Sequence, residues 1–400
     1  MASFINNKNV GVCGFVNSNE FILWDVPHND VNGELISHKL KCIAKSHTEE
    51  DKEVNSNVKV EVNDIVSIAI SNSFKFIAAS DFRNSLYLWG KVESSFKLIS
   101  VRSLSRRCHK LIFTNSGSNV IVSDRGGDVF LFSVSNFDDS GKLILGHICL
   151  ITDIAISEND DYLATCDRDA KIRISCFPNC YNIHSYCLGH QDFISSLHFL
   201  PFNNEVLFSS SGDGTLRLWN FKSGTEICSL HIEEKIFLEN KKLDEASKIE
   251  KSSLSKEKKN ENDSNSAVKM VTYCNKFKMC AVSFHTRVGV ALYEIADKSL
   301  SFNFVQYISL LSIPLSISFD ANGTLFIILA NLEKPILMYE CCPANKMHFT
   351  QVTDVSKTCV VREIYKFCPD IRDIKSQNDF EILKKRVFDD DETSCNKKVK

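Results

Sequence analysis

A histidine, an aspartate and a short run of serines in this sequence could together support nucleophilic chemistry. His190 follows a glycine, Asp213 stands in a Ser-Gly-Asp-Gly turn, and the serines Ser209–Ser211 lead into that turn. A hydroxyl, an imidazole and a carboxylate are the parts of a catalytic triad. The same parts can also form a purely structural hydrogen-bonded chain. The elements that carry these residues decide between the two interpretations.

A second group of residues has the types that bind zinc. Cys176, Cys180, His184 and Cys187 fall close together in the sequence, and a structural zinc would need all four to converge tetrahedrally. The segment has no Cys-x2-Cys turn and crosses from one expected strand to the next. Successive side chains of a strand point in opposite directions, so we do not expect a metal site here.

Other motifs of enzyme chemistry are missing from the sequence. We find no glycine-rich loop between a strand and a helix, no Gly-x-Ser-x-Gly elbow and no His-Glu-x-x-His pair. We therefore predict no catalytic residue, no bound metal and no cofactor of its own for this chain.

The segment that carries His190 and Asp213, Leu188–Phe221, has the pattern of one WD repeat. It begins with Gly-His, continues as two strands joined by a turn, and closes a third strand on Trp219. In such repeats the histidine, a strand hydroxyl, the turn aspartate and the tryptophan form a buried hydrogen-bonded chain. We therefore interpret His190, Asp213 and Trp219 as a structural network, with the hydroxyl supplied from Ser209–Ser211.

The ending of the third strand recurs along the chain and predicts the number of repeats. Endings of this kind fall at Trp24, Trp89, Phe132, Ser175, Trp219, Tyr293 and Tyr339. Successive endings are 65, 43, 43, 44, 74 and 46 residues apart, and a four-stranded blade takes about forty to forty-five residues. The two long gaps hold insertions. We predict an all-β fold, a seven-bladed WD40 β-propeller whose ring closure protects the strand edges.

The insertions and the end of the chain set the expected domain limits. We place the propeller at residues 1–345, with an inserted loop at 29–63, and a charged, partly disordered C-terminal extension at 346–400. Residues 239–266 hold as many lysines as acidic residues and almost no large apolar ones. Such a segment cannot bury enough surface to offset its ordering entropy, so we predict a disordered insertion.

Composition excludes several classes of protein. The formal net charge of −3 excludes a strongly basic nucleic-acid binder, so contact with RNA must come from a local patch or a partner. The first residues have no basic start followed by an apolar run, and we expect no secretory signal. The longest purely apolar stretch, Leu325–Ala330, is too short to span a bilayer. We expect the sixteen cysteines to be reduced thiols, most of them buried.

One turn carries more charge than a turn needs. When CDRDAKIRIS is aligned with the WD repeat that follows it, Asp169 takes the place of the structural aspartate. Asp167, Arg168 and Lys171 then replace small or uncharged residues, and Ser175 replaces the tryptophan, so we expect an incomplete buried network there. Composition leaves two interpretations open, a solvated loop whose charges pair with each other and a binding interface.

The sequence around this turn resembles a particular family. The segments ITDIAISENDDYLATCDRDAKIRIS, SYCLGHQDFISSLHFLP and LFSSSGDGTLRLW are similar to the non-catalytic WD-repeat subunit of the eukaryotic tRNA (guanine-N7)-methyltransferase, the Wuho family in insects. The specific part is the run ATCDRDAKIRIS followed directly by a CLGH repeat. The resemblance is good over Ile151–Gly224 and weaker elsewhere.

The resemblance implies a scaffold and not an enzyme. The chain would bind and stabilise a separate catalytic subunit in a heterodimer, and that subunit would hold S-adenosylmethionine and form 7-methylguanine at position 46 of the tRNA variable loop. The tRNA would be bound mainly through the complex, with no membrane involved. The resemblance also places the protein in the nucleus, with the cytoplasm as a second location, and Lys384–Arg386 has the composition of a nuclear-localisation patch.

The resemblance also implies where the partner docks. The expected surface is the side of the propeller around the charged turn, at Asp167, Arg168, Lys171 and Arg173, with Arg173 pairing with a carboxylate of the partner. Reversing the charge of Arg173 is then expected to break the complex and to leave the thermal melt of the propeller unchanged.

Two other functions remain open at this point. One is a generic WD40 interaction scaffold, such as a ubiquitin-ligase adaptor or a chromatin platform, which would read peptides at the central channel. The other is an enzyme that uses the central funnel, which would need carboxylates or metal ligands converging at its mouth.

Overall fold

The fold was analysed in a computed structural model of the chain. The structure describes residues 65–93, 95–232, 266–320, 322–329, 336–342 and 348–352 with their side chains, and the backbone of residues 3–7, 10–14, 20–25 and 37–41. The predicted disordered insertion, apart from Ser266, and the chain beyond residue 352 lie outside these residues. All regular elements within them are β-strands.

The described strands form seven four-stranded antiparallel sheets, each built from four consecutive strands and numbered here in chain order. The first four sheets contain β1 (Ser3–Asn7), β2 (Val10–Gly14), β3 (Glu20–Asp25) and β4 (Ser37–Lys41); β5 (Ile65–Ile70), β6 (Phe76–Asp81), β7 (Ser85–Val92) and β8 (Ser95–Ser103); β9 (Cys108–Phe113), β10 (Asn119–Asp124), β11 (Asp128–Ser133) and β12 (Lys142–Gly146); and β13 (Ile151–Ile156), β14 (Tyr162–Asp167), β15 (Lys171–Cys176) and β16 (Ile183–Leu188). The last three contain β17 (Ile194–Phe199), β18 (Val206–Ser211), β19 (Thr215–Asn220) and β20 (Thr225–His231); β21 (Val268–Cys274), β22 (Met279–Phe284), β23 (Gly289–Ala296) and β24 (Ser301–Ser309); and β25 (Pro314–Phe319), β26 (Leu325–Leu329), β27 (Ile336–Cys342) and β28 (His348–Gln351).

This arrangement confirms the prediction of an all-β WD40 propeller. Every strand ending that predicted the repeats, from Trp24 to Tyr339, lies in the third strand of its sheet. At Phe132, Trp219, Tyr293 and Tyr339 this residue is large and packs in a core cluster shared with the preceding sheet. The local pattern therefore reports the repeat correctly even where the tryptophan is replaced.

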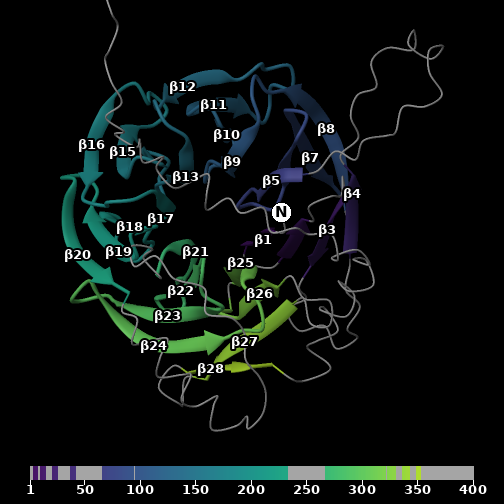
Figure 1. Cartoon of the computed structure of the whole chain (residues 1–400). Helices are drawn as coiled ribbons and strands as arrows, with labels where there is room; N and C mark the ends of the chain where they lie inside the picture. Colours follow the sequence, from purple (N-terminus) through teal and green to yellow (C-terminus); the bar gives the residue numbers. More distant parts are fainter. Residues whose placement is uncertain are drawn as a thin grey trace, which may run out of the picture.

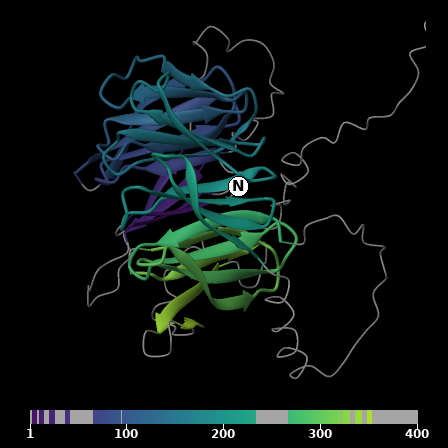
Figure 2. The same cartoon turned by 90° about the vertical axis from the view of Figure 1, so that its left-hand side faces the viewer.

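The sheets stand around one central axis with the first strand of each sheet innermost (Figure 1). Each innermost strand packs beside the innermost strand of the next sheet, and β1 lies beside both β5 and β25. Among the described strands the ring is therefore closed by packing of β1 against β25, and none of these strands is shared between the first and seventh sheets. Figure 2 shows the same ring from the side.

The hydrophobic core lies in layers between neighbouring sheets. One such layer joins sheets five and six and includes Phe208, Leu218 and Tyr293, and another joins sheets four and five and includes Ile174 and Trp219. Second strands are buried on both faces, and all six residues of β18 and of β22 are buried. A strand buried on both faces reads as a continuous run of apolar and small residues, because neither face meets water.

Two strands depart from the expected domain limits. β4 lies within residues 29–63, where the sequence predicts an inserted loop, and β28 lies beyond residue 345, where we place the end of the propeller. Fourth strands give little signal in the sequence, because they lie on the outer rim (Figure 1) and few of their described side chains are buried. In β20, for example, no residue is buried. The propeller therefore extends at least to Gln351.

Two further expectations concern a membrane-spanning segment and the state of the cysteines. A search of the described residues for a helix of membrane-spanning length and hydropathy finds none, and most of the apolar stretch at Leu325–Ala330 forms the buried strand β26. The described cysteines are free thiols, and Cys166 and Cys280, which lie in strands, are both buried.

Innermost strands leave one edge without a strand partner, and polar side chains bond to the backbone groups there. Asp153 of β13 is the clearest case: its Oδ2 accepts a hydrogen bond from the Leu197 amide of β17 at 2.9 Å. Its Oδ1 lies 2.9 Å from the ammonium of Lys110 on β9, and this carboxylate raises the pKa of Lys110. One buried carboxylate thus links the innermost strands of three sheets.

We predict that Asp153→Ala lowers the free energy of unfolding by about 1–3 kcal/mol, because the buried Leu197 amide loses its acceptor. Asp153→Asn is the matched control, since its side-chain oxygen can still accept from Leu197, and only the contacts of Oδ1 with Lys110 and with the Ile154 amide are lost. Urea denaturation of both variants provides the measurement. Equal stability of the alanine variant and the wild type would contradict the bridging role.

Candidate partner-binding site

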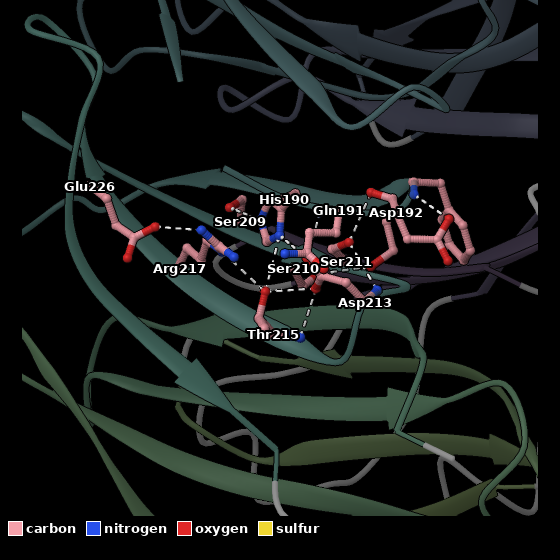
Figure 3. A network of polar contacts seen from close by, with 12 residues as sticks. His190, Gln191, Asp192, Ser209, Ser210, Ser211, Asp213, Thr215, Arg217 and Glu226 are labelled. Atoms are coloured by element: carbon pink, nitrogen blue, oxygen red, sulfur yellow. Dashed lines mark hydrogen bonds and ion pairs between the residues drawn. The ribbon is translucent and has the colours of Figure 1, made fainter. Parts of the chain in front are cut away.

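Sheet five contains the hydrogen-bonded chain expected of a WD repeat (Figure 3). His190 Nδ1 lies 3.0 Å from Asp213 Oδ2, and His190 Nε2 lies 2.8 Å from Ser209 Oγ. Trp219 Nε1 donates to the same hydroxyl at 2.8 Å. Of the three candidate serines, the structure therefore places Ser209 in the chain. The loop before β17, the turn after β18 and the strand β19 are joined by these contacts.

The hydrogen-bonded Ser209, His190 and Asp213 side chains are the residue types of a catalytic triad, but they are buried. Ser209 is fully buried, His190 is 8% exposed and Trp219 is 1% exposed. Trp219 can only donate, so Ser209 accepts from it and donates its own proton to His190 Nε2, which leaves Nδ1–H for Asp213. The Ser209 hydroxyl is therefore committed on both sides and faces no solvent, and the arrangement serves to brace the fold.

The aspartate of this chain is held in its charged form. Burial would raise the pKa of Asp213, but hydrogen bonds from His190, from the Thr215 hydroxyl and from the Gln191 amide outweigh it and lower the pKa below its usual range. A buried carboxylate that accepts several hydrogen bonds is stabilised as the anion. The Asp213–His190 pair contributes to the stability of the fold at every pH at which Asp213 is ionised.

Sheet four contains the same brace, built on a different aspartate from the one that the sequence alignment predicts. His147 Nδ1 lies 3.0 Å from Asp167 Oδ2, and His147 Nε2 lies 2.8 Å from Thr165 Oγ1. The structural aspartate is therefore Asp167 at the end of β14, two residues before Asp169. The dipeptide Gly146-His147, which repeats Gly189-His190, was the signal in the sequence that could have identified this histidine.

Asp167 also shapes the charged turn itself. Its Oδ1 accepts the backbone amides of Asp169 at 3.0 Å and of Lys171 at 3.1 Å. Burial opposes ionisation, yet these amides and His147 lower the pKa of Asp167. Between them, Ala170 adopts a φ of 64°, where sheet five has Gly214 at 78°. A side chain in this left-handed region costs roughly 1–2 kcal/mol, which the amide contacts of the carboxylate help to offset.

Arg173 is engaged inside the protein. Its Nη2 donates to the carbonyl oxygen of Cys180 at 2.7 Å, its Nη1 to that of Gly146 at 3.3 Å, and its Nε to Ser175 Oγ at 3.0 Å. Ser175, which stands in the place of a tryptophan, is fully buried and serves as an acceptor. Among the described residues no donor takes the place of Trp219 at the strand hydroxyl Thr165, so the network of sheet four lacks this contact, as expected, and Arg173 braces the fold through separate contacts.

The remaining charged residues of the turn differ in exposure. Lys171 is exposed, and the described residues include no hydrogen-bond or ion-pair partner for its ammonium. Arg168 is half-buried, and its buried Nε has no partner among the described residues. Asp169 accepts a hydrogen bond from the Cys149 thiol at 2.6 Å. The turn therefore presents two cations that the chain itself does not neutralise.

Exposed apolar side chains surround these cations. On β16, the outermost strand of sheet four, Leu188 is 61% exposed and Tyr186 is 43% exposed. They lie directly opposite Lys171 and Arg173 across the β15–β16 ladder, so these side chains share one face of the sheet. Ile148, in the loop that contacts the turn, is fully exposed. We call Ile148, Arg168, Lys171, Tyr186 and Leu188 the lateral surface.

The zinc-like residues do not come together. Cys180 and Cys187 are buried, and burial raises the pKa of each thiol to about 12. His184 is exposed and packs against the ring of Tyr162. Within the part of the chain that the structure describes, no group of three or more potential ligands is placed to hold a metal ion.

A family comparison covers the region of this site. Residues 134–339 match the family described as the tRNA methyltransferase TRM82 WD40 domain. This range is about half of the chain, and it contains the charged turn, both braces and the whole lateral surface.

Three similar proteins are named as the same subunit. The Xenopus laevis protein named tRNA (guanine-N(7)-)-methyltransferase non-catalytic subunit wdr4 is 34% identical over 69% of this chain and 65% of its own length. The Mus musculus protein named as the same subunit, WDR4, is 40% identical over 48% of this chain and 46% of its own length. The Drosophila pseudoobscura pseudoobscura protein, named as this subunit wuho, is 38% identical over 44% of each chain. The chain therefore covers less than two thirds of the length of each of these relatives.

Solved structures share the architecture at low sequence identity. The RRP9 WD40 repeats superpose with a TM-score of 0.59 at 15% identity, covering 83% of this chain and 88% of that one. The Myceliophteria thermophila Cps50 (Swd1) β-propeller domain superposes with a TM-score of 0.58 at 11% identity, covering 84% and 95%. These likenesses concern the fold alone.

The lowered pKa of Asp213 predicts a specific dependence of stability on acid. Its contribution is fully present above the ordinary carboxyl pKa of about 4 and is lost as the pH falls through the lower native value. At neutral pH we expect Asp213→Asn to unfold with a free energy about 1–3 kcal/mol lower than the wild type, and we expect this difference to shrink below about pH 4. Denaturant titrations from neutral to acidic pH measure it.

Glu205→Gln is the control for this series, since Glu205 is exposed and pairs only with Lys222 at the surface. It should follow the wild type at every pH. A difference between Asp213→Asn and the wild type that stays constant down to the lowest pH would refute the linkage.

Because Arg173 bonds to two carbonyl oxygens, we expect its substitution to change the thermal melt of the propeller, contrary to the prediction from the sequence. Arg173→Ala removes donors from the Gly146 and Cys180 carbonyl oxygens, and we expect a loss of about 1–3 kcal/mol in unfolding free energy, seen as a lower melting temperature. Lys171→Ala, two residues away on the same face of the strand, should melt like the wild type. Equal melting of the two variants would show that Arg173 braces nothing.

Proposed function

The chain belongs to the family of the tRNA methyltransferase TRM82 WD40 domain, and from this we propose that it is the non-catalytic scaffold subunit of a heterodimeric tRNA (guanine-N7)-methyltransferase. The observation that carries the proposal is the family match over residues 134–339. The names of the frog, mouse and fly relatives as non-catalytic subunits support it.

In this proposal the chemistry belongs to the partner. The catalytic subunit holds S-adenosylmethionine and transfers its methyl group to a guanine of the tRNA, as the resemblance implies. This chain contributes a rigid docking surface that stabilises the partner by binding its folded form. Its own buried Ser209–His190–Asp213 chain supports that rigidity, because it ties loops to strands without reaching solvent.

The lateral surface is the docking site that we propose for the partner. It combines exposed apolar side chains with the two cations that the chain leaves unneutralised. A partner surface with an apolar centre and acidic residues at its edge would complement it, because charges at the rim guide association while buried aromatic residues supply most of the affinity. Of the four charged residues predicted from sequence, Arg168 and Lys171 would contact the partner.

The other two charged residues, Asp167 and Arg173, affect partner binding indirectly, because they hold the turn in place. Asp167 holds the amides on both sides of Ala170, and Arg173 ties β15 to the loops at Gly146 and Cys180. Both determine where Arg168 and Lys171 are presented. Their substitution would therefore weaken partner binding indirectly and would lower the stability of the propeller as well.

Nuclear localisation is part of the same proposal. Its support is the basic triplet Lys384–Arg386, which lies outside the described residues, and the resemblance to the family. Nothing in the propeller bears on this point, so fluorescence microscopy of the tagged chain with and without the triplet is the direct test.

The docking surface is tested by co-purification with the catalytic subunit and by the affinity of the complex. We expect Lys171→Glu and Arg168→Glu each to weaken binding by about tenfold or more, with a slower association rate and a weaker dependence on salt. Tyr186→Ala should weaken it by a similar factor through faster dissociation. All three variants should melt within a few degrees of the wild type, since none of the side chains braces the fold.

Matched controls lie on β8, the outer strand of sheet two. Lys97→Glu and Leu98→Ala change an exposed charge and a similarly exposed apolar residue away from the lateral surface, and both should bind the partner normally. If the wild type fails to bind a tRNA methyltransferase catalytic subunit, the proposed function is wrong. If the wild type binds and the lateral variants bind equally well, only the site is wrong.

A further inference from the structure

The charged turn of sheet four carries one carboxylate more than its brace uses. In sheets two, three and four, an aspartate at the end of the second strand accepts the amides two and four residues later: Asp81, Asp124 and Asp167. In sheet five Ser211 stands at that place, and the aspartate comes two residues later, at Asp213. Among these four turns, only that of sheet four has an aspartate at both places, Asp167 and Asp169.

The extra carboxylate, Asp169, takes no part in the brace, because the histidine of sheet four contacts Asp167. It accepts a hydrogen bond from the Cys149 thiol at 2.6 Å instead. Cys149 lies two residues after His147 in the loop between β12 and β13, so this bond joins the loop to the turn. The bond is also the largest cause that raises the pKa of the thiol, which keeps its proton available for donation.

Two cations of the same turn form no ion pair with this carboxylate in the described structure. Arg168 directly precedes Asp169, and Lys171 follows it by two residues. The Arg168 charge is close enough to the Cys149 thiol to oppose the rise in its pKa, yet Arg168 Nε has no hydrogen-bond partner. Asp169 is therefore bound to a neutral donor although two cations stand beside it in the turn.

The neutral donor decides whether these cations are free for a partner. A surface ion pair and a single hydrogen bond to a charged group contribute similar, small free energies. Without the thiol, the Asp169 carboxylate would therefore turn to Arg168 or Lys171. A carboxylate of the partner would then have to displace Asp169 from the cation before it could bind, and the complex would be weaker.

We propose that Cys149 is a positioning residue of the lateral surface: its thiol holds the Asp169 carboxylate and so keeps Arg168 and Lys171 available. This inference rests on the proposed function, because the lateral surface is the docking site proposed there for the catalytic subunit. Cys149 acts through Asp169 and needs no contact with the partner. A hydroxyl at this position can replace the thiol as a donor, whereas a methyl group cannot.

The first test compares two substitutions of Cys149 in the full-length chain, with the affinity for the catalytic subunit measured by calorimetry. We expect Cys149→Ala to weaken binding by about twofold to fivefold, the effect of one surface ion pair. This is less than the effect expected for Lys171→Glu, which reverses a charge. Cys149→Ser keeps a donor for Asp169 and should bind like the wild type.

A second substitution separates positioning from packing. Asp169→Asn removes the charge that would engage the two cations, so adding Cys149→Ala to this variant should weaken binding no further. Residues that act through one contact give such non-additive effects, whereas independent effects add. If Cys149 only packed the loop, its substitution would cost the same affinity with and without the Asp169 charge. Thermal melts of all variants check that the propeller remains folded.

The outcomes distinguish this inference from the proposed function. If the wild type does not bind the catalytic subunit, both fail. If the wild type binds and Cys149→Ala binds equally well, only the role of Cys149 is overturned. The same holds if Cys149→Ser loses as much affinity as Cys149→Ala, or if the loss persists in the Asp169→Asn background. A loss that appears in Cys149→Ala and vanishes in both other cases supports the positioning role.

Discussion

The buried carboxylate at the turn between the second and third strands is the interaction on which the rest of this propeller depends. It accepts the amides of the turn through one oxygen and offers the other to the loop that enters the sheet, so a single side chain sets both the turn and the joint between neighbouring sheets. The core lies in layers between sheets, and each layer requires its two sheets to be held in register. A carboxylate that stays ionised supplies this through several hydrogen bonds at once.

The variation of this one interaction around the ring distinguishes the sheets from each other. Sheet five uses the full chain from histidine to tryptophan, and sheet four has the histidine, the hydroxyl and the aspartate without the tryptophan. Sheet two uses a tyrosine, and in sheet three Asp124 Oδ2 is buried without a hydrogen-bond partner among the described residues. The same turn is therefore braced to different degrees in different sheets. The lateral surface also depends on this interaction, because only side chains that do not brace the fold are free to contact a partner.

Sequence reasoning went furthest where the signal is local. The strand endings from Trp24 to Tyr339 identify the third strand of every sheet, and the pattern at His190 and Trp219 identifies the brace of sheet five. The sequence prediction was wrong where we inferred a side-chain contact from the alignment of two repeats. Asp169 aligns with Asp213, yet His147 contacts Asp167 at the end of β14, and Asp169 contacts Cys149 instead. Outer strands such as β28 escape detection because few of their side chains are buried, so few of their positions need to be apolar.

By itself the sequence determined that this chain is a ring of WD repeats and which turn carries unusual charge, since strand alternation, turn residues and charge are properties of neighbouring residues. Only the tertiary structure decided which of those charges are available. Arg173 is held by carbonyl oxygens from two other segments, whereas Lys171, two residues earlier on the same strand, points to solvent. Hydrogen-bond partners from distant segments become known only when the chain is folded, and they separate a brace from a binding residue.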